Sequence, residues 1–584
     1  MQIQRILVLL LLFSTLTFSK ELELPTHVII FEGQTHFDAA EIAEGIGVDH
    51  KSIFEFWKDD TMRIKDKLLP TLHSSLNSFY DSEGFYDAEF EIKENNTSIV
   101  VKVKENTPVL VNDVNVSSDF NISELVSFQK GEIFRAAQFI EVKGKIIQVL
   151  LKDGYCSYEL DSKAYVDLEK HLVDLRYDLK KGGVCTFGKM TVRGLKTIDE
   201  DIIQSRVRAK EGDRFNMELI QDTSQSINAL HAFDSVLIGV DRKFYNVVPV
   251  DIRVEEIQKP YHLEVGAGYD TYVGARVHGE VTKYNFLGNA QELSLQAAWS
   301  QREQLAILSF FKPVLFDIED FAIDLGAKGG YSNLEFEGFK EKKFFFDTFL
   351  EHQSDQLQMK LGMALEAIEI STLDDGIELP QIEYNTFLLA YPYVNIVWDA
   401  RDSKLDPKYG YYLSAYTEYG IPTDEQSSLY LKTILEARAI YTVSHLTLAM
   451  VAKIGGIKVE DDSYAGIPES KKFLVGGVNY NRAYGIREMG VITSDTVTTV
   501  YGAMSMANLS FEADYPVWGD LGAAVFVDNT MLNRDSYDYS GPIITSAGLG
   551  VRYATPIGPF KLDVGMNVND PSQYGVQFQI GQSF

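Results

Sequence analysis

The chain has 584 residues, too many for one hydrophobic core, and this length predicts roughly four domains unless one large barrel replaces two of them. Its 84 acidic and 54 basic side chains give a formal net charge of −30, which excludes the phosphate-driven binding used by nucleic-acid proteins. The chain is 45% hydrophobic and 12% aromatic, with 43 Gly and only 2 Cys, which is the composition of a folded protein. Many Gly and aromatic residues with few Cys suit β-structure, and membrane barrels are one such class.

Residues 1–19 predict an export signal. Arg5 precedes an apolar run from Ile6 to Phe13, and Thr17 and Ser19 place small residues before a cleavage site at Lys20. The alternative, a membrane-anchoring helix, needs about 20 apolar residues, and this run is much shorter. No later apolar run reaches that length, so a mature chain that meets a bilayer is expected to do so as a β-barrel.

Residues 20–260 contain three similar blocks with a period of roughly 75 to 85 residues. Each block opens with a strand-like stretch, continues with apolar residues at helical spacing and closes with two alternating segments. The helix ends at Gly84-Phe85 in the first block and at Gly154-Tyr155 in the second, but Ala232 replaces the glycine in the third. Each block therefore predicts a β-α-β-β unit with room for a second helix. Three unrelated adhesive modules are the alternative.

Both cysteines lie near the boundary between the second and third blocks. Cys156 belongs to the second block and Cys185 begins the third. In an oxidising compartment they could form a disulfide that joins the two blocks. Two buried thiols are an equal alternative, because the sequence does not give the Cα separation that a disulfide requires. Neither alternative predicts a metal site, since no cysteine or histidine partner has suitable spacing.

Residues 261–584 consist of long segments that alternate between apolar and polar side chains. In one of them, Leu431 and Leu435 alternate with Lys432, Glu436 and Arg438. The apolar face of such a strand looks into a core in a soluble sandwich, whereas in a membrane barrel it faces lipid and the polar face lines the lumen. Segments of about 12 residues exceed typical soluble strands and can cross a bilayer at a tilt, which favours the barrel.

Sixteen such segments can be counted, an even number as bacterial barrels require. They are residues 261–272, 274–286, 291–301, 303–315, 320–333, 341–352, 356–370, 382–397, 410–420, 428–443, 446–460, 497–514, 521–531, 542–554, 559–568 and 574–584. Connections after even segments are mostly short, whereas the longest one, residues 461–496, follows an odd segment. This asymmetry predicts short periplasmic turns and long outer loops.

Two motifs in the barrel half resemble known signatures. The segment from Gly476-Gly477 through Arg482 and Tyr484 to Gly485 resembles the sixth-loop signature of BamA, TamA and two-partner secretion transporters, with Ala483 in place of the family's glycine. The last segment resembles the C-terminal β-signal of outer-membrane proteins, through Gln573, Gly575, Phe578, Ile580 and Phe584.

With the three blocks, these motifs make the whole mature chain resemble the BamA/TamA-like outer-membrane assembly factors. The fold class implied is three α+β POTRA repeats followed by an all-β, 16-stranded transmembrane barrel. The expected boundaries are 1–19 for the signal peptide, 20–108, 109–182 and 183–258 for the POTRA domains, and 259–584 for the barrel. Three repeats point to the TamA branch, because BamA carries five and the two-partner transporters carry two.

The resemblance also implies a set of functional residues. In this family the loop arginine folds into the lumen and meets acidic side chains on the twelfth and thirteenth strands, which correspond here to Arg482, Glu512 and Asp528. An exposed loop arginine with two ordinary lumen carboxylates is the alternative. Gly266 and Gly268 in the first strand and Gly575 and Gly581 in the last are expected to weaken the seam that closes the barrel.

No catalytic constellation or cofactor motif appears, so the chain is not expected to be an enzyme or to need a cofactor or metal. The resemblance implies insertion of β-barrel or autotransporter-type clients into the outer membrane, with lateral opening at the seam and POTRA domains in the periplasm that dock clients. Expected partners are unfolded outer-membrane proteins, outer-membrane lipid and an inner-membrane-anchored TamB-like protein. The alternative is a passive channel or phospholipid conduit that works with a periplasm-spanning partner.

Overall fold

The computed structural model describes residues 26–48, 61–95, 98–240, 246–270, 274–318, 321–336, 339–372, 386–491, 500–555 and 558–580. The predicted signal peptide, Gly581 and Phe584 lie outside the described residues. The chain forms two compact units. The first holds residues up to Met190 with 209–220 and 240–250, and the second holds 191–208, 221–239 and the chain from Asp251 onward.

The first repeat is a four-stranded sheet in the order β2-β1-β4-β3. Its elements are β1 (Thr26–Glu32), α2 (Ala39–Gly45), β2 (Arg63–Lys65), η2 (Asp66–Thr71), α3 (Leu72–Ser82), β3 (Glu89–Glu94) and β4 (Ser98–Lys104). β1 runs parallel to the central strand β4, with Val28 opposite Ser98. α3 buries Leu72, Leu76 and Tyr80, which are four residues apart and so share one helix face against the sheet.

The second and third repeats each have a three-stranded sheet, in the orders β5-β7-β6 and β8-β10-β9. Their elements are β5 (Leu110–Ser118), α4 (Ala136–Lys152), β6 (Glu159–Asp167) and β7 (Leu172–Lys180), then β8 (Thr186–Arg193), α5 (Glu200–Gln204), α6 (Met217–Asn228), β9 (Phe233–Val240) and β10 (Val247–Glu256). No helix in the described part of the chain is long and apolar enough to span a membrane.

The first and third repeats share a buried carboxylate at the end of their last strand. Glu105 accepts hydrogen bonds from the backbone N–H groups of Thr35 and His36, both at 3.0 Å. Glu256 accepts them from Lys196 and Thr197, at 2.6 and 2.9 Å. Burial alone would raise the pKa of Glu105, but the hydrogen bonds from Thr35 and His36 outweigh it and lower that pKa. Each carboxylate therefore caps the turn that follows the first strand of its repeat.

The linker that follows each repeat is held to that repeat by the same kind of backbone hydrogen bond. Its backbone N–H donates to the carbonyl of the residue that ends the preceding helix region: Val109 to Gly84 at 2.8 Å, Cys185 to Gly154 at 2.9 Å, and Ile257 to Ala232 at 2.9 Å. At the second linker a disulfide joins Cys156 to Cys185, whose Cα atoms are 5.9 Å apart. This resolves the two alternatives for the cysteines in favour of the disulfide.

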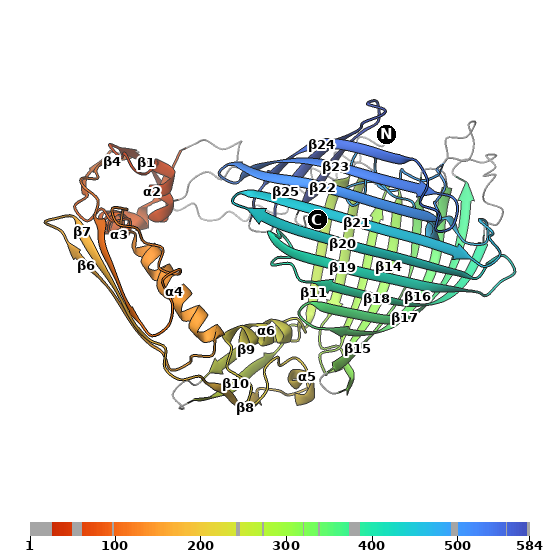
Figure 1. Cartoon of the computed structure of the whole chain (residues 1–584), viewed down its shortest axis with the longest axis horizontal. Coiled ribbons are helices and arrows are strands. Elements are labelled where there is room, and N and C mark those ends of the chain that lie inside the picture. Colours follow the sequence, from red (N-terminus) through yellow and green to blue (C-terminus); the bar gives the residue numbers. More distant parts are fainter. Residues whose placement is uncertain are drawn as a thin grey trace. The chain divides into compact units, whose positions relative to one another are not determined.

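The barrel is a 16-stranded antiparallel sheet, as predicted, with its strands in sequence order from β11 to β26 (Figure 1). The strands are β11 (Tyr261–Asp270), β12 (Gly274–Lys283), β13 (Glu292–Ser300), β14 (Glu303–Ile318), β15 (Phe321–Glu335), β16 (Phe339–Gln353), β17 (Leu357–Thr372), β18 (Thr386–Asp399), β19 (Tyr409–Pro422), β20 (Tyr430–Val443), β21 (Leu446–Val459), β22 (Ser505–Trp518), β23 (Leu521–Asn533), β24 (Ile543–Tyr553), β25 (Phe560–Asn567) and β26 (Tyr574–Ile580).

The predicted start of the twelfth strand, residue 497, is wrong. β22 begins at Ser505. Tyr501 and Ala503 instead pair with Val491 and Phe473 of the preceding long loop. Their alternating pattern therefore reflects a small pairing inside the loop and not the barrel wall.

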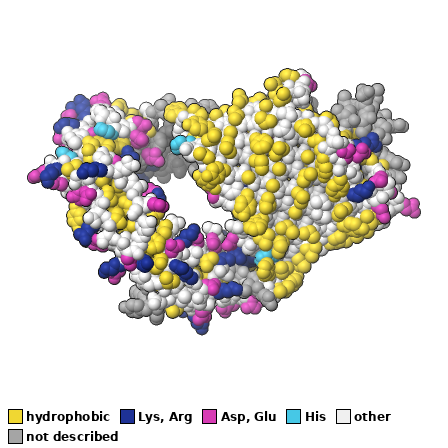
Figure 2. Space-filling model, in the orientation of Figure 1, with side chains coloured by type: hydrophobic (Ala, Val, Ile, Leu, Met, Phe, Trp, Pro, Cys, Tyr) yellow, Lys and Arg dark blue, Asp and Glu magenta, His cyan; other side chains and the backbone are white. Residues whose placement is uncertain are grey.

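Side chains alternate across the barrel wall as a lipid-facing sheet requires. On β21, Leu448 and Met450 are exposed on the outside, whereas Thr447 and Lys453 are buried on the inside. Hydrophobic side chains cover the visible face of the barrel broadly, and charged side chains are concentrated on the repeats (Figure 2). The expected polar lumen is only partly correct. Inward residues such as Phe339, Ile457 and Met506 form an apolar core with the long loop.

Candidate functional site in the barrel lumen

The long connection between β21 and β22, residues 460–504, is called loop 6 here. Its described residues pack into an apolar core with inward residues of the barrel wall, through Ile467, Phe473, Val475, Met489, Ala503 and Met504. Its short internal pairings join Val475 to Met489 and Phe473 to Ala503. Gly476 has φ +121°, and a Cβ there would lie 2.2 Å from the carbonyl oxygen of Gly485. Gly477 also has a positive φ, of +77°. The paired glycines of the motif therefore allow the sharp turn and close approach at the loop tip.

Arg482 of the tip is 2% exposed and is enclosed by carboxylates. Its Nε and Nη2 donate to the two oxygens of Asp528 on β23, at 3.0 and 2.9 Å. Its Nη1 donates to Glu512 on β22 and, at 3.3 Å, to Asp563 on β25. The guanidinium also lies 3.4 Å over the ring of Phe526. Bidentate pairing and stacking are the geometry for which arginine is suited and lysine is not.

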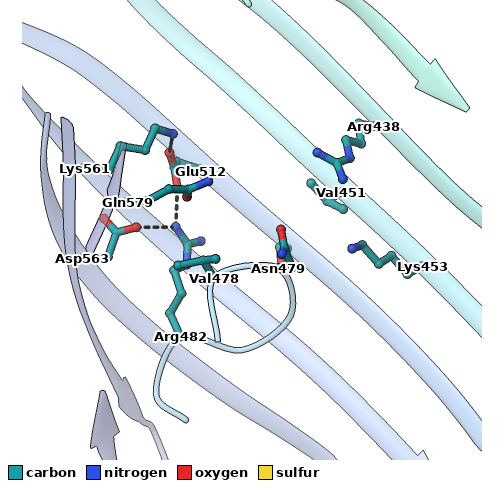
Figure 3. Close-up of a pocket in the computed structure, with 11 residues that line it drawn as sticks. Arg438, Val451, Lys453, Val478, Asn479, Arg482, Glu512, Lys561, Asp563 and Gln579 are labelled. Carbon is teal, nitrogen blue, oxygen red and sulfur yellow. Dashed lines mark hydrogen bonds and ion pairs between the residues drawn. The ribbon is translucent and has the colours of Figure 1, made fainter. Parts of the chain in front are cut away.

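A second tier of cations balances these carboxylates. Arg552 on β24 donates to Glu512 at 2.9 Å and pairs with Asp563 at 2.5 Å. Lys561 on β25 lies 3.6 Å from Glu512. Figure 3 shows Arg482, Glu512, Lys561 and Asp563 converging on one another from the loop and from two strands. Because every carboxylate has at least one cation partner, the cluster can remain ionised although it is buried.

The neighbouring Asn481 secures the loop backbone. Its side chain is fully buried; Nδ2 donates to the carbonyl of Ile544 at 3.3 Å, and Oδ1 accepts from Ser546 at 2.5 Å. Ala483, which replaces the family's glycine, does not adopt a positive φ and is fully buried. The substitution therefore causes no backbone strain at this position.

The loop tip is also bound by the last strand and by Gln573, the residue before it. Gln573 and Gln577 donate through Nε2 to the carbonyls of Ala483 and Tyr484, at 3.0 and 2.9 Å. The Tyr484 hydroxyl accepts from Asn567 at 2.8 Å. A Cβ at Gly575 would lie 2.5 Å from the carbonyl oxygen of Arg482. The weak seam expected at Gly575 stays a prediction; what the structure shows is that the missing side chain of Gly575 makes room for the loop.

The predicted seam residues lie at the two ends of the strand order. Gly266 and Gly268 are on β11, opposite His278 and Arg276 of β12. Phe578 and Ile580 are on β26, opposite Leu562 and Phe560 of β25. Among the residues that the structure describes, no hydrogen-bonded ladder joins β26 to β11. Gly581 and Phe584 lie outside the described residues.

Several members of this cluster were not identified from the sequence. They are Asn481, Arg552, Lys561, Asp563, Asn567 and Gln577. One signal could have indicated Lys561 and Asp563: they lie on the same face of β25 as Gly565 and Asn567, opposite the apolar face of that strand. Their contacts with Arg482 depend on the fold of the loop, which strand patterning does not give.

The family model for the Omp85 superfamily domain matches residues 285–584. The outer membrane protein assembly factor BamA of Nitratidesulfovibrio vulgaris is 21% identical over 95% of this chain and 72% of its own length. BamA of Neorickettsia risticii is 22% identical over 92% of this chain and 74% of its own length.

Among solved structures, BamA from Haemophilus ducreyi lacking POTRA domains 1–3 superposes with a TM-score of 0.53 at 16% identity, covering 81% of this chain and all of that one. This likeness supports the fold. The Omp85 match spans just over half of the sequence and includes loop 6 and the Arg482 cluster. The chain therefore belongs to the Omp85 superfamily, with its barrel in the outer membrane and its POTRA repeats in the periplasm.

Proposed function

We propose that this protein is an outer-membrane assembly factor that inserts or translocates β-barrel or autotransporter-type clients, without an enzymatic step. The POTRA domains, proposed as residues 20–108, 109–182 and 183–258, dock the clients and an inner-membrane-anchored partner. A client strand adds to the edge of the sheet between β11 and β26 and enters the bilayer sideways. Backbone hydrogen bonds drive this step, because an edge strand presents unpaired N–H and C=O groups.

One observation carries the proposal: β26 is held by loop 6 and by β25, and no described ladder joins it to β11. The strand at this end of the sheet therefore has support from inside the barrel that is independent of a seam. An edge held in this way can exchange partners while the rest of the sheet keeps its register.

The lumen argues against the alternative of a passive channel through the barrel. Loop 6 packs Phe473, Val475 and Met489 against inward residues of the wall and forms one buried apolar core with them. A hydrated path would have to replace this core with water, at the cost of exposing its apolar surface. A phospholipid conduit through the lumen meets the same obstacle.

The finer assignment to the TamA branch, with a TamB-like partner, is part of this proposal. It rests on the three repeat sheets in the part of the chain that the structure describes. The relatives reported above carry the name BamA. Co-purification of a large inner-membrane-anchored protein with the full chain supports the TamA branch, whereas co-purification of outer-membrane lipoproteins alone contradicts it.

Site-specific photocrosslinking tests the insertion step. A photoreactive residue at Ala267 on β11 should capture nascent client chains, because this residue faces outward at the end of the sheet. The control is the same residue at Leu365, which is exposed in the middle of the strand order on β17. Client adducts at Ala267 and not at Leu365 support insertion at the seam. Equal capture at both positions, or capture of lipid alone, contradicts it.

A further inference from the structure

A second loop cation, Lys471, lies at the base of loop 6, in the short helix η3 (Glu469–Lys471). Its side chain is about one-tenth exposed, and its Nζ lies 2.9 Å from Glu366 on β17 and 3.7 Å from Glu418 on β19. The ammonium also lies 3.8 Å over the ring of Tyr391 on β18. These three strands form a different stretch of wall from β22, β23 and β25, which carry the carboxylates that pair with Arg482.

The wall residues form a prearranged cation site. Glu366 and Glu418 are only 7% and 3% exposed. Tyr391 donates its hydroxyl to Glu366, and Tyr430 donates its hydroxyl to Glu418, both at 2.9 Å. Hydroxyl donors orient the two carboxylates but do not neutralise them. Lys343 on β16 lies 3.5 Å from Glu366, whereas in the described part of the chain the ion pair of Glu418 is with Lys471. Lys471 therefore lowers the cost of keeping Glu418 buried and ionised, and it adds a second cation at Glu366.

The backbone at Lys471 is held as well. Its carbonyl accepts a hydrogen bond of 2.7 Å from Lys432 on β20. The adjacent Lys472 pairs with Glu469, which in turn accepts a hydrogen bond of 2.9 Å from the N–H of Gly502. This contact ties the start of the loop to its end. The base of loop 6 is therefore a compact unit, and Lys471 attaches it to the wall through both its side chain and its carbonyl.

The surroundings strengthen this attachment. Phe473, directly after the base, packs into the apolar core with Ile457 and Met506 of the wall. Such a core excludes water, and ion pairs in a water-poor site are screened less than exposed ones. Unlike Lys471, Lys458 is more than half exposed, and it pairs with Asp462 at the protein surface.

We propose that Lys471 is a positioning residue that anchors the base of loop 6 independently of Arg482 at the tip, and that the loop leaves the lumen only when both sites are broken. The anchoring follows from the contacts above. Its consequence for client insertion rests on the proposed function. With two anchors on separate stretches of wall, the base of the loop can loosen while the tip stays in place, and the tip can loosen while the base stays in place.

Cysteine accessibility in the full-length protein in outer membranes tests the two anchors separately. Ala503 and Ala483 are both fully buried, the first beside the loop base and the second at the tip. Each is changed to cysteine in turn, and its rate of maleimide labelling is measured. The native cysteines do not interfere, because they form a disulfide. Lys471→Ala should raise labelling of A503C by roughly tenfold or more and leave A483C protected, since a buried ion pair has lost one partner.

Matched variants complete the design. Lys458→Ala removes an exposed cation and should change neither reporter, whereas Lys471→Arg keeps the charge and should restore most of the protection at A503C. Arg482→Ala should show the reverse pattern, with A483C labelled and A503C protected. Glu418→Gln serves as a second way to weaken the base if Lys471→Ala prevents assembly.

The pattern of labelling decides the inference. Exposure of A503C alone in Lys471→Ala supports an anchor at the base. Equal exposure of both reporters overturns it, because that result indicates general loosening of the loop, and so does continued protection of both. Client assembly is measured in the same strains as a separate readout. Normal client assembly with A503C exposed still supports Lys471 as an anchor of the loop base. It counts against a role of loop 6 in the proposed client insertion.

Discussion

At the scale of single residues, the arrangement depends on how carboxylates inside the barrel are neutralised. Asp528 is 1% exposed, and in the described part of the chain its ion-pair partner is Arg482. Glu512 differs, since Arg552 and Lys561 also lie near it. Loss of Arg482 therefore removes the ion-pair partner of Asp528, whereas Glu512 keeps Arg552 and Lys561 near it.

This difference gives a test by a double-mutant cycle. Arg482→Ala should destabilise the docked loop by about 3–5 kcal/mol, because it leaves a buried carboxylate without its cation. Asp528→Asn in the same chain should recover part of that loss, so the double variant is less damaged than the two single effects predict. Loop accessibility and client assembly are the measurements, and Arg487→Ala, a loop arginine stacked near Phe336, is the control. Strictly additive effects would show that Arg482 and Asp528 do not interact.

Glu105 in the first repeat gives a prediction for pH. Its folded pKa lies below the ordinary value of about 4.3, so its stabilisation is present above that pH and is lost as pH falls through the folded pKa. Glu105→Gln should cost about 1–3 kcal/mol at neutral pH, since the amide accepts the backbone hydrogen bonds less well. Hydrogen exchange at the Thr35 and His36 amides in the full chain is the measurement.

The control for this prediction is Glu94→Gln, because Glu94 is exposed on β3. In the parent protein the two amides should exchange faster, relative to their intrinsic rates, as the pH falls below 4.3. The Glu105→Gln variant should lose most of that dependence. The same pH profile in the variant and the parent would mean that another group controls this turn.

Some residues of the Arg482 cluster could be predicted from the sequence, and others could not. Arg482, Glu512 and Asp528 were expected from the family resemblance of the loop motif, and the structure places Arg482 in contact with both carboxylates. Asp563 and Gln577 could not be predicted, because their contacts depend on where the tip of loop 6 lies. The alternation of a strand shows which side chains point inward, but it does not show what fills the lumen beside them.

At the level of helices and strands, the alternation of apolar and polar residues predicted the barrel strands well. It also predicted a strand in one segment that belongs to a loop. Residues 500–504 alternate like a barrel strand, yet Tyr501 and Ala503 pair with Val491 and Phe473 within loop 6, and β22 starts at Ser505. Short alternation is the same for any two-stranded pairing. The disulfide could not be decided from the sequence either, because it depends on how the linker returns past Gly154.

The junction between the second and third repeats should be the most rigid of the linkers. All three share the backbone hydrogen bond described above, but only this one among the described residues has a covalent link. Replacing Cys156 and Cys185 by serine should remove about 3–4 kcal/mol of stabilisation that comes from closing the 29-residue separation. Limited proteolysis should then cut near this junction first. An unchanged cleavage pattern, in the variant and in reduced parent protein, would contradict this role.

At the scale of the whole molecule, the fold was largely predictable because its two halves carry different periodicities. Helical spacing followed by paired strands marks each repeat, and long period-2 segments mark the barrel. The apolar core inside the barrel was not predicted. Inward positions near the outer end carry Phe, Ile and Met because loop 6 covers them, and a rule that assigns polar residues to the lumen does not allow for a plugged barrel.

If clients enter the bilayer between β11 and β26, as proposed, locking these two strands together should stop insertion. Ala267→Cys on β11 is combined in turn with Tyr574→Cys, Val576→Cys and Phe578→Cys, which are exposed on the outer face of β26. The native cysteines are replaced by serine so that they do not exchange. Slower migration after boiling than before it confirms that each barrel has assembled. Oxidation should block client insertion, and a reductant should restore it. Full insertion with the two strands completely crosslinked would contradict it.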